Sequence, residues 1–148
     1  MLKIRTKLAC EIAGIDPARF NDAIHSNLFP CAPQTRPGAS RIFEIEDIIV
    51  MRIYRQLIDP AGPRFAAEKA GGIACDIRVR IADPEVKAVS YAVSTSGPGK
   101  IMSRALALED SIFGDGSPIF FAMNFNIGAL RAQITEHLNH EQQIFGED

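Results

Sequence analysis

The segment from Asn27 to Phe43 limits what the first half of this chain can fold into. It holds Pro30, Pro33 and the turn-forming run Arg36-Pro37-Gly38. Prolines this close together exclude a helix, because each lacks a backbone N–H and fixes its own φ angle. The segment therefore predicts a small hairpin, with two short extended pieces joined at Arg36-Pro37-Gly38.

Two short helices are predicted before this segment. Thr6 can cap a helix from Lys7 to Ala13, and Gly14 suits the left-handed residue that ends it. The pair Asp16-Pro17 can start a second helix that runs to about Ser26, since Asp is a good N-cap and Pro is favoured at the first helical position. Two short helices around a glycine-containing turn form a helix-turn-helix layout.

Two longer helices are predicted after the proline-rich segment. A periodic apolar pattern predicts a helix from Glu44 to about Leu57. Another helix is expected to begin near Pro63, and Gly71-Gly72 could interrupt it. Residues 76–81 fit both helical and alternating spacing, and we prefer a helix that ends before Asp83-Pro84.

The second half of the sequence has a strand-rich pattern. Residues 86–94 alternate larger with smaller side chains and predict a strand, with a helix as the competing interpretation, and residues 100–108 can return as a second strand. Residues 119–125 predict a buried strand, and residues 127–143 predict a helix. We therefore expect an α+β fold: an N-terminal winged helix-turn-helix in residues 1–82, then a small β-containing region with a C-terminal helix in residues 83–148.

Five short motifs follow one another between residue 4 and about residue 75. They are Leu8–Ile15, Asp16–Phe20, Asn27–Pro30, Arg41–Ile48 and Gly62–Ala66. In this order they resemble the opening helix, recognition helix, wing entry, wing exit and following helix of the MerR group of winged helix-turn-helix regulators. The resemblance implies a dimer that binds DNA, and a related phage or prophage regulator fits equally well. The chain departs from the group in its less basic recognition helix and in the strands that precede its last helix.

The candidate DNA contacts lie on the second predicted helix and on the hairpin. Arg can read guanine and Asn can read adenine in the major groove, and Arg on a wing can bind phosphate. A solvated helix face and a plain polar hairpin are the alternatives, and Arg41 could instead brace the wing against Asp47. The candidate contact residues are Lys7, Pro17, Ala18, Arg19, Asn21, Asp22, His25, Gln34, Thr35, Arg36, Ser40 and Arg41.

The charge distribution agrees with DNA contacts in the first half. The whole chain has a net charge of −2. Residues 1–80 hold 12 Lys and Arg against 9 Asp and Glu, a balance of +3, whereas residues 81–148 hold 4 against 9, a balance of −5. The first half is therefore the better candidate for meeting phosphates.

The last predicted helix is the candidate dimer interface. Ile127, Leu130, Ile134 and Leu138 form one apolar seam along it. A dimer is favoured because two recognition helices related by a twofold axis read half-sites one helical turn apart. The alternative is that the seam covers the strands of its own chain.

Catalytic and metal-binding motifs are weak in this sequence. Gly97-Pro98-Gly99-Lys100 lacks the spacing of a phosphate-binding P-loop, and His137 and His140 are typical of a solvated helix end. No Ser-His-Asp or Cys-His catalytic signature is present. We therefore expect neither an enzyme nor a bound metal or cofactor.

The cysteines and the hydropathy pattern indicate a cytoplasmic protein. Cys10, Cys31 and Cys75 are odd in number and form no CxxC pair, so we expect reduced thiols. The first residues do not form a secretory signal, and no apolar run approaches the ~20 residues that a membrane span requires.

The expected function is that of a sequence-specific transcriptional regulator that binds double-stranded DNA as a homodimer. One alternative keeps DNA as the ligand: an architectural or excisionase-like protein, or a DNA-packaging protein of a phage. The other is a small-molecule-binding or protein-interaction module whose helices only mimic the motif.

Overall fold

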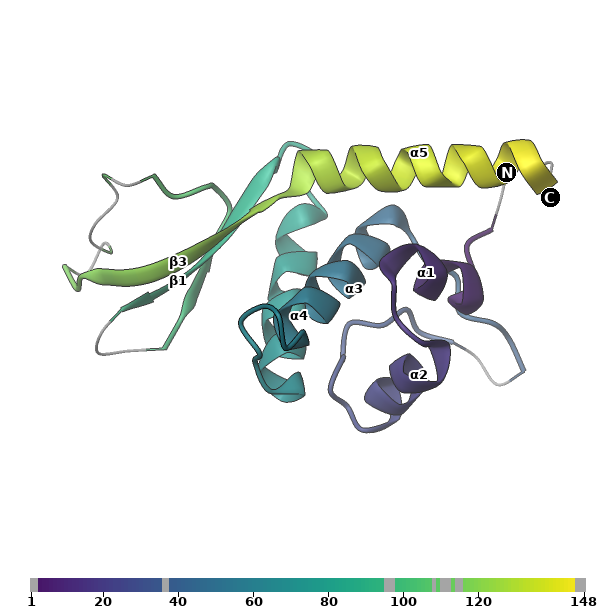
Figure 1. Ribbon diagram of the computed structural model, residues 1–148, viewed down its shortest axis with the longest axis horizontal. Helices are drawn as coiled ribbons and strands as arrows, with labels where there is room; N and C mark the ends of the chain where they lie inside the picture. Colours follow the sequence, from purple (N-terminus) through teal and green to yellow (C-terminus); the bar gives the residue numbers. More distant parts are fainter. Residues whose placement is uncertain are drawn as a thin grey trace.

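The computed structural model describes residues 3–35, 38–94, 98–107, 109, 113 and 116–145. Over these residues the chain forms five helices and three strands, an α+β fold. The helices pack together, and the strands form a small sheet that projects from one side of them (Figure 1).

The first two helices begin and end close to where the sequence predicts. α1 (Thr6–Ala13) ends at Gly14, whose φ of 76° is left-handed. α2 (Pro17–His25) is capped by Asp16, whose carboxylate accepts the backbone N–H of Arg19 at 3.1 Å. The predicted cap at Thr6 is wrong: Thr6 is the first helical residue, and Arg5 holds the cap position without a side-chain bond.

The loop between α2 and α3, residues 26–44, is not the predicted hairpin. Its described residues, 26–35 and 38–44, form turns and irregular structure without a strand. Side chains close this loop instead: Thr35 Oγ1 donates to the carbonyl of Ala39 at 2.5 Å, and Arg41 donates to the carbonyl of Pro33. The alternative role of Arg41 as a brace against Asp47 is wrong, because the Asp47 carboxylate bonds to Arg78 and to the Glu44 N–H instead. The predicted turn at Arg36-Pro37 lies outside the described residues.

The next two helices form the centre of the molecule. α3 (Ile45–Ile58) begins with a capping box, in which Glu44 N–H donates to the Asp47 carboxylate at 2.8 Å. α4 (Ala67–Ile81) begins four residues later than the expected start near Pro63 and continues through Gly71-Gly72 without a break. The preferred helical interpretation of residues 76–81 is confirmed.

The sheet is antiparallel, in the order β2-β1-β3. Its strands are β1 (Ala88–Ser94), β2 (Lys100–Met102) and β3 (Ile119–Asn126). The return strand is shorter than residues 100–108, and the predicted burial of the last strand is wrong, because β3 lies at the edge of the sheet and Phe120 is 75% exposed. Central β1, by contrast, is mostly buried.

α5 (Ile127–Phe145) follows β3 directly and lies across α3 (Figure 1). Ile127 and Ile134 are completely buried, and Leu130 and Leu138 pack partly buried against the same core. The seam expected to join two chains thus has partners inside one chain. Arg52 on α3 also donates to the amide oxygen of Gln133 at 2.9 Å, which fixes α5 on the helices of the first half.

Candidate nucleic-acid interface

α2 has one buried face and one polar, exposed face. Phe20 is 1% exposed and Ala23 is 6% exposed, so these two residues hold the helix on the protein. The α2 residues that the sequence predicts to contact DNA are all exposed: Pro17, Ala18, Arg19, Asn21, Asp22 and His25. The helix therefore presents its donors and acceptors to solvent from a fixed position.

An aromatic cluster sets the orientation of that exposed face. The ring of Phe20 meets that of Phe29 edge-on at a centroid distance of 5.4 Å and lies 6.2 Å from that of Phe43. Phe29 in turn meets Tyr54 of α3 edge-on at 5.3 Å. Edge-to-face packing is directional, so the cluster fixes α2, the α2–α3 loop and α3 relative to one another.

The candidate residues outside α2 have mixed positions. Lys7 on α1 is exposed, as are Gln34, Thr35 and Ser40 on the loop. Arg41 is half-buried and donates to the Pro33 carbonyl, so part of its guanidinium already holds the loop together. Arg36 lies outside the described residues.

Three further cations lie beside the α2–α3 loop and the turn between α1 and α2. Ile4 is buried, and its carbonyl accepts the backbone N–H of Phe43 at 2.8 Å, so the exposed Lys3 and Arg5 flank the return of the α2–α3 loop. Arg55 on α3 borders the turn between α1 and α2, because a Cβ at Gly14 would lie 3.4 Å from its guanidinium. The +3 charge balance of residues 1–80 was the only signal for them.

The exposed face of α2 is electrostatically mixed. Arg19 is accompanied by Asp22 on the same helix and by Asp16 at its N-cap, and both carboxylates are exposed. Exposed positive charge is found instead at Lys3, Arg5 and Lys7, before and within α1. This arrangement can bind phosphate at the edges of the surface and leave the centre of α2 for polar contacts of defined geometry.

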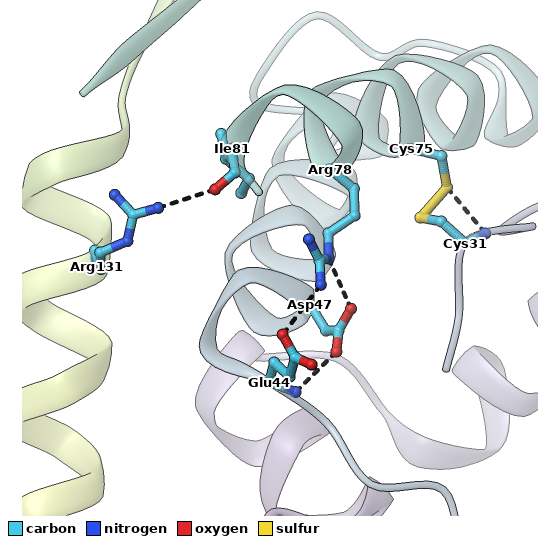
Figure 2. Close-up of polar contacts among 7 residues, drawn as sticks. All are labelled: Cys31, Glu44, Asp47, Cys75, Arg78, Ile81 and Arg131. Carbon is cyan, nitrogen blue, oxygen red and sulfur yellow. Dashed lines mark hydrogen bonds and ion pairs between the residues drawn. A yellow bond between two sulfur atoms is a disulfide. The ribbon is translucent and has the colours of Figure 1, made fainter. Parts of the chain in front are cut away.

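An ion-pair network holds α3 and α4 together behind the loop (Figure 2). Arg78 Nε donates to the buried Asp47 carboxylate at 2.8 Å, and its terminal nitrogen lies 3.4 Å from the Glu44 carboxylate. In the same view Arg131 of α5 donates to the carbonyl of Ile81 at 3.2 Å, where α4 ends. The three helices are thus joined by charged as well as apolar contacts.

A disulfide links the α2–α3 loop to α4 (Figure 2). Cys31 and Cys75 are bonded, with their Cα atoms 5.4 Å apart, and the backbone N–H of Cys31 lies 3.2 Å from Cys75 Sγ. The expectation of three reduced thiols is therefore wrong for two of them. Cys10 is a buried thiol, and burial, followed by the charge of Asp16, raises its pKa to about 11.

In comparisons with known proteins, no protein-family model and no curated sequence matches this chain. Within the described residues, no three His, Cys, Asp or Glu side chains gather where they could hold a metal ion. None of the helices in that part of the chain is long and apolar enough to cross a membrane.

Proposed function

We propose that this protein is a cytoplasmic, sequence-specific transcriptional regulator that binds double-stranded DNA. One observation carries the proposal: every candidate contact residue on α2 is exposed, whereas Phe20 and Ala23 on the other side of the same helix are buried. α1 and α2 would act as the helix-turn-helix, with α2 in the major groove, and the irregular α2–α3 loop would take the place of a wing hairpin on the backbone or in the minor groove.

The polar side chains of α2 would supply the sequence preference. Arg19 can donate to guanine, Asn21 can bond to adenine in two places, and Asp22 can accept from the amino group of cytosine. Lys3, Arg5, Lys7 and Arg55 would supply affinity through phosphate, and this part of the binding would weaken as salt rises.

The regulator would act as a homodimer. A single short helix reads few base pairs, and a twofold axis doubles the site that is read. The cytoplasm is reducing, so the Cys31–Cys75 bond would be exposed to reduction there.

Selection from a random duplex library, followed by anisotropy titrations at several salt concentrations, tests this function. We expect enrichment of a defined sequence. For that sequence, Arg19→Ala and Asn21→Ala should each weaken binding by about 1–3 kcal/mol.

Lys87→Ala is the matched control, because it removes one positive charge from an exposed position in the acidic half. It should bind like the unchanged protein. Binding without sequence enrichment would favour an architectural role, and failure to bind any duplex at low salt would overturn the proposal.

A further inference from the structure

β3 is an edge strand whose outer side has no partner in the described part of the chain. Seven of its eight residues pair with β1, Phe120 is skipped where the register shifts between Val93 and Ser94, and no other described strand pairs with it. The side chain of Asn124 bonds to Leu106, accepting its N–H and donating to its carbonyl, both at 2.9 Å. These bonds involve a side chain of β3, and no described residue forms a backbone hydrogen bond with the outer edge of the strand.

Exposed edges in soluble proteins are normally protected by charged side chains, by internal proline or by short length. β3 has none of these three features, and its one irregularity is the register shift at Phe120, near the start of the strand. The sequence has no charged side chain from Gly116 to Leu130, and its only proline there, Pro118, precedes the strand. Phe120 is 75% exposed and Phe121 is 41% exposed.

The helices do not cover this edge of the sheet. β1 and β3 project away from the packed helices (Figure 1), and α5 leaves the strand at its far end. Phe121, Met123 and Phe125 lie opposite Val93, Tyr91 and Val89 of β1, so they share one apolar face of the sheet.

We propose that β3 pairs antiparallel with β3 of a second copy of this chain, which makes one continuous sheet across the dimer. The edge offers a row of backbone donors and acceptors with which another strand can pair, and an identical uncharged strand can do so without like-charge repulsion. This inference assigns an interface to the homodimer of the proposed function, but it does not depend on DNA binding.

Symmetry restricts how two copies of β3 can pair. The twofold axis of two antiparallel strands is perpendicular to their sheet, so residues on the same face lie opposite one another. With the axis at Met123, Phe121 lies opposite Phe125 of the partner subunit, and Met123 lies opposite its own copy. This register places aromatic side chains in cross-strand pairs, a favourable arrangement.

The solution mass of the intact protein, measured by light scattering at tens of micromolar, is the first test. We expect the mass of two chains. Phe120→Lys combined with Phe121→Lys should reduce it to the mass of one chain with an unchanged circular dichroism spectrum, since both side chains are substantially exposed. Val79→Lys is the control, because Val79 is 76% exposed on α4 and should leave the dimer intact.

Disulfide trapping tests the register. Met123→Cys should form a covalent dimer on mild oxidation, because opposed residues in adjacent strands lie within disulfide range. Val79→Cys should form much less covalent dimer under the same conditions. Equal yields of covalent dimer from Met123→Cys and Val79→Cys would overturn this interface. So would a dimer that persists in the variant with Phe120→Lys and Phe121→Lys.

A monomeric intact protein would also overturn it, including one whose edge binds an extended peptide of another protein. DNA binding by such a monomer would leave the proposed function standing. A β3-paired dimer that binds no DNA would refute the proposed function alone.

Discussion

Gly71 on α4 lies directly against the backbone of Leu28, just after α2. A Cβ at Gly71 would lie 1.7 Å from the carbonyl oxygen of Leu28, far inside any permitted contact. The absence of a side chain at Gly71 therefore allows α4 to support the segment that leaves α2, and so helps to set the position of the candidate DNA-binding face.

Gly71→Ala should destabilise the protein by about 2–3 kcal/mol, because the added methyl group would force α4 and the backbone at Leu28 apart. Gly72→Ala is the control, since a Cβ at Gly72 meets nothing within 4 Å. That change should stabilise the helix by about 0.5–1 kcal/mol, because alanine is the better helix former. Urea denaturation of both variants measures the difference, and a similar effect at the two positions would contradict this packing.

Arg78→Met should lower the free energy of unfolding by about 2–4 kcal/mol, because it leaves the buried carboxylate of Asp47 without its cation. Arg80→Met is the matched comparison. Arg80 pairs with Asp76 at 3.3 Å, but these side chains are 35% and 50% exposed. Its removal should cost less than about 1 kcal/mol, since solvent screens exposed pairs. Equal losses in chemical denaturation would mean that burial does not distinguish the two ion pairs.

Reduction of the Cys31–Cys75 bond should lower the free energy of unfolding. The two residues are 44 apart in sequence, and closing a loop of that length removes entropy from the unfolded chain. The loss expected on reduction is about 2–4 kcal/mol. Denaturation with and without dithiothreitol measures it.

The double variant Cys31→Ser, Cys75→Ser should no longer respond to dithiothreitol, whereas Cys10→Ala should respond as the unchanged protein does. An unchanged protein whose stability is the same in both conditions would refute this contribution of the bond.

Cys10 should make stability fall at high pH. Its pKa is raised from 9.0 to about 11 by burial and then by Asp16. The unfolded chain loses the thiol proton at lower pH than the folded chain. The contribution of Cys10 to the free energy of unfolding is therefore fully present below pH 9.0 and is lost as the pH rises through about 11. The loss attributable to Cys10 should be about 2–3 kcal/mol.

Cys10→Ala should lack this part of the pH dependence, so the difference between the two stability curves isolates it. In the folded protein Cys10 should also resist iodoacetamide at pH 8, because the thiolate is the reactive form. Rapid alkylation of Cys10 without unfolding would contradict its burial.

Local chemistry in the sequence was enough to locate most of the helices and strands. Gly14 ends α1 and Asp16-Pro17 begins α2 because capping acts between residues a few positions apart. The periodic apolar pattern that begins at Ile45 predicts α3, because helical periodicity also relates residues only three or four positions apart. The polar face of α2 could also be predicted, because one buried stripe on a short helix defines the opposite side.

The tertiary structure alone decided which surfaces are covered. β3 has the composition of a buried strand, yet it lies at the edge of the sheet, because strand order depends on contacts between distant segments. The seam of α5 would be apolar whether it joined two chains or packed within one, and only the packing shows that Ile134 is buried inside its own chain. The pairing of Cys31 with Cys75 has no local sequence pattern at all. Caps and turns are determined within a few residues of sequence, whereas burial depends on which distant segment occupies the neighbouring space.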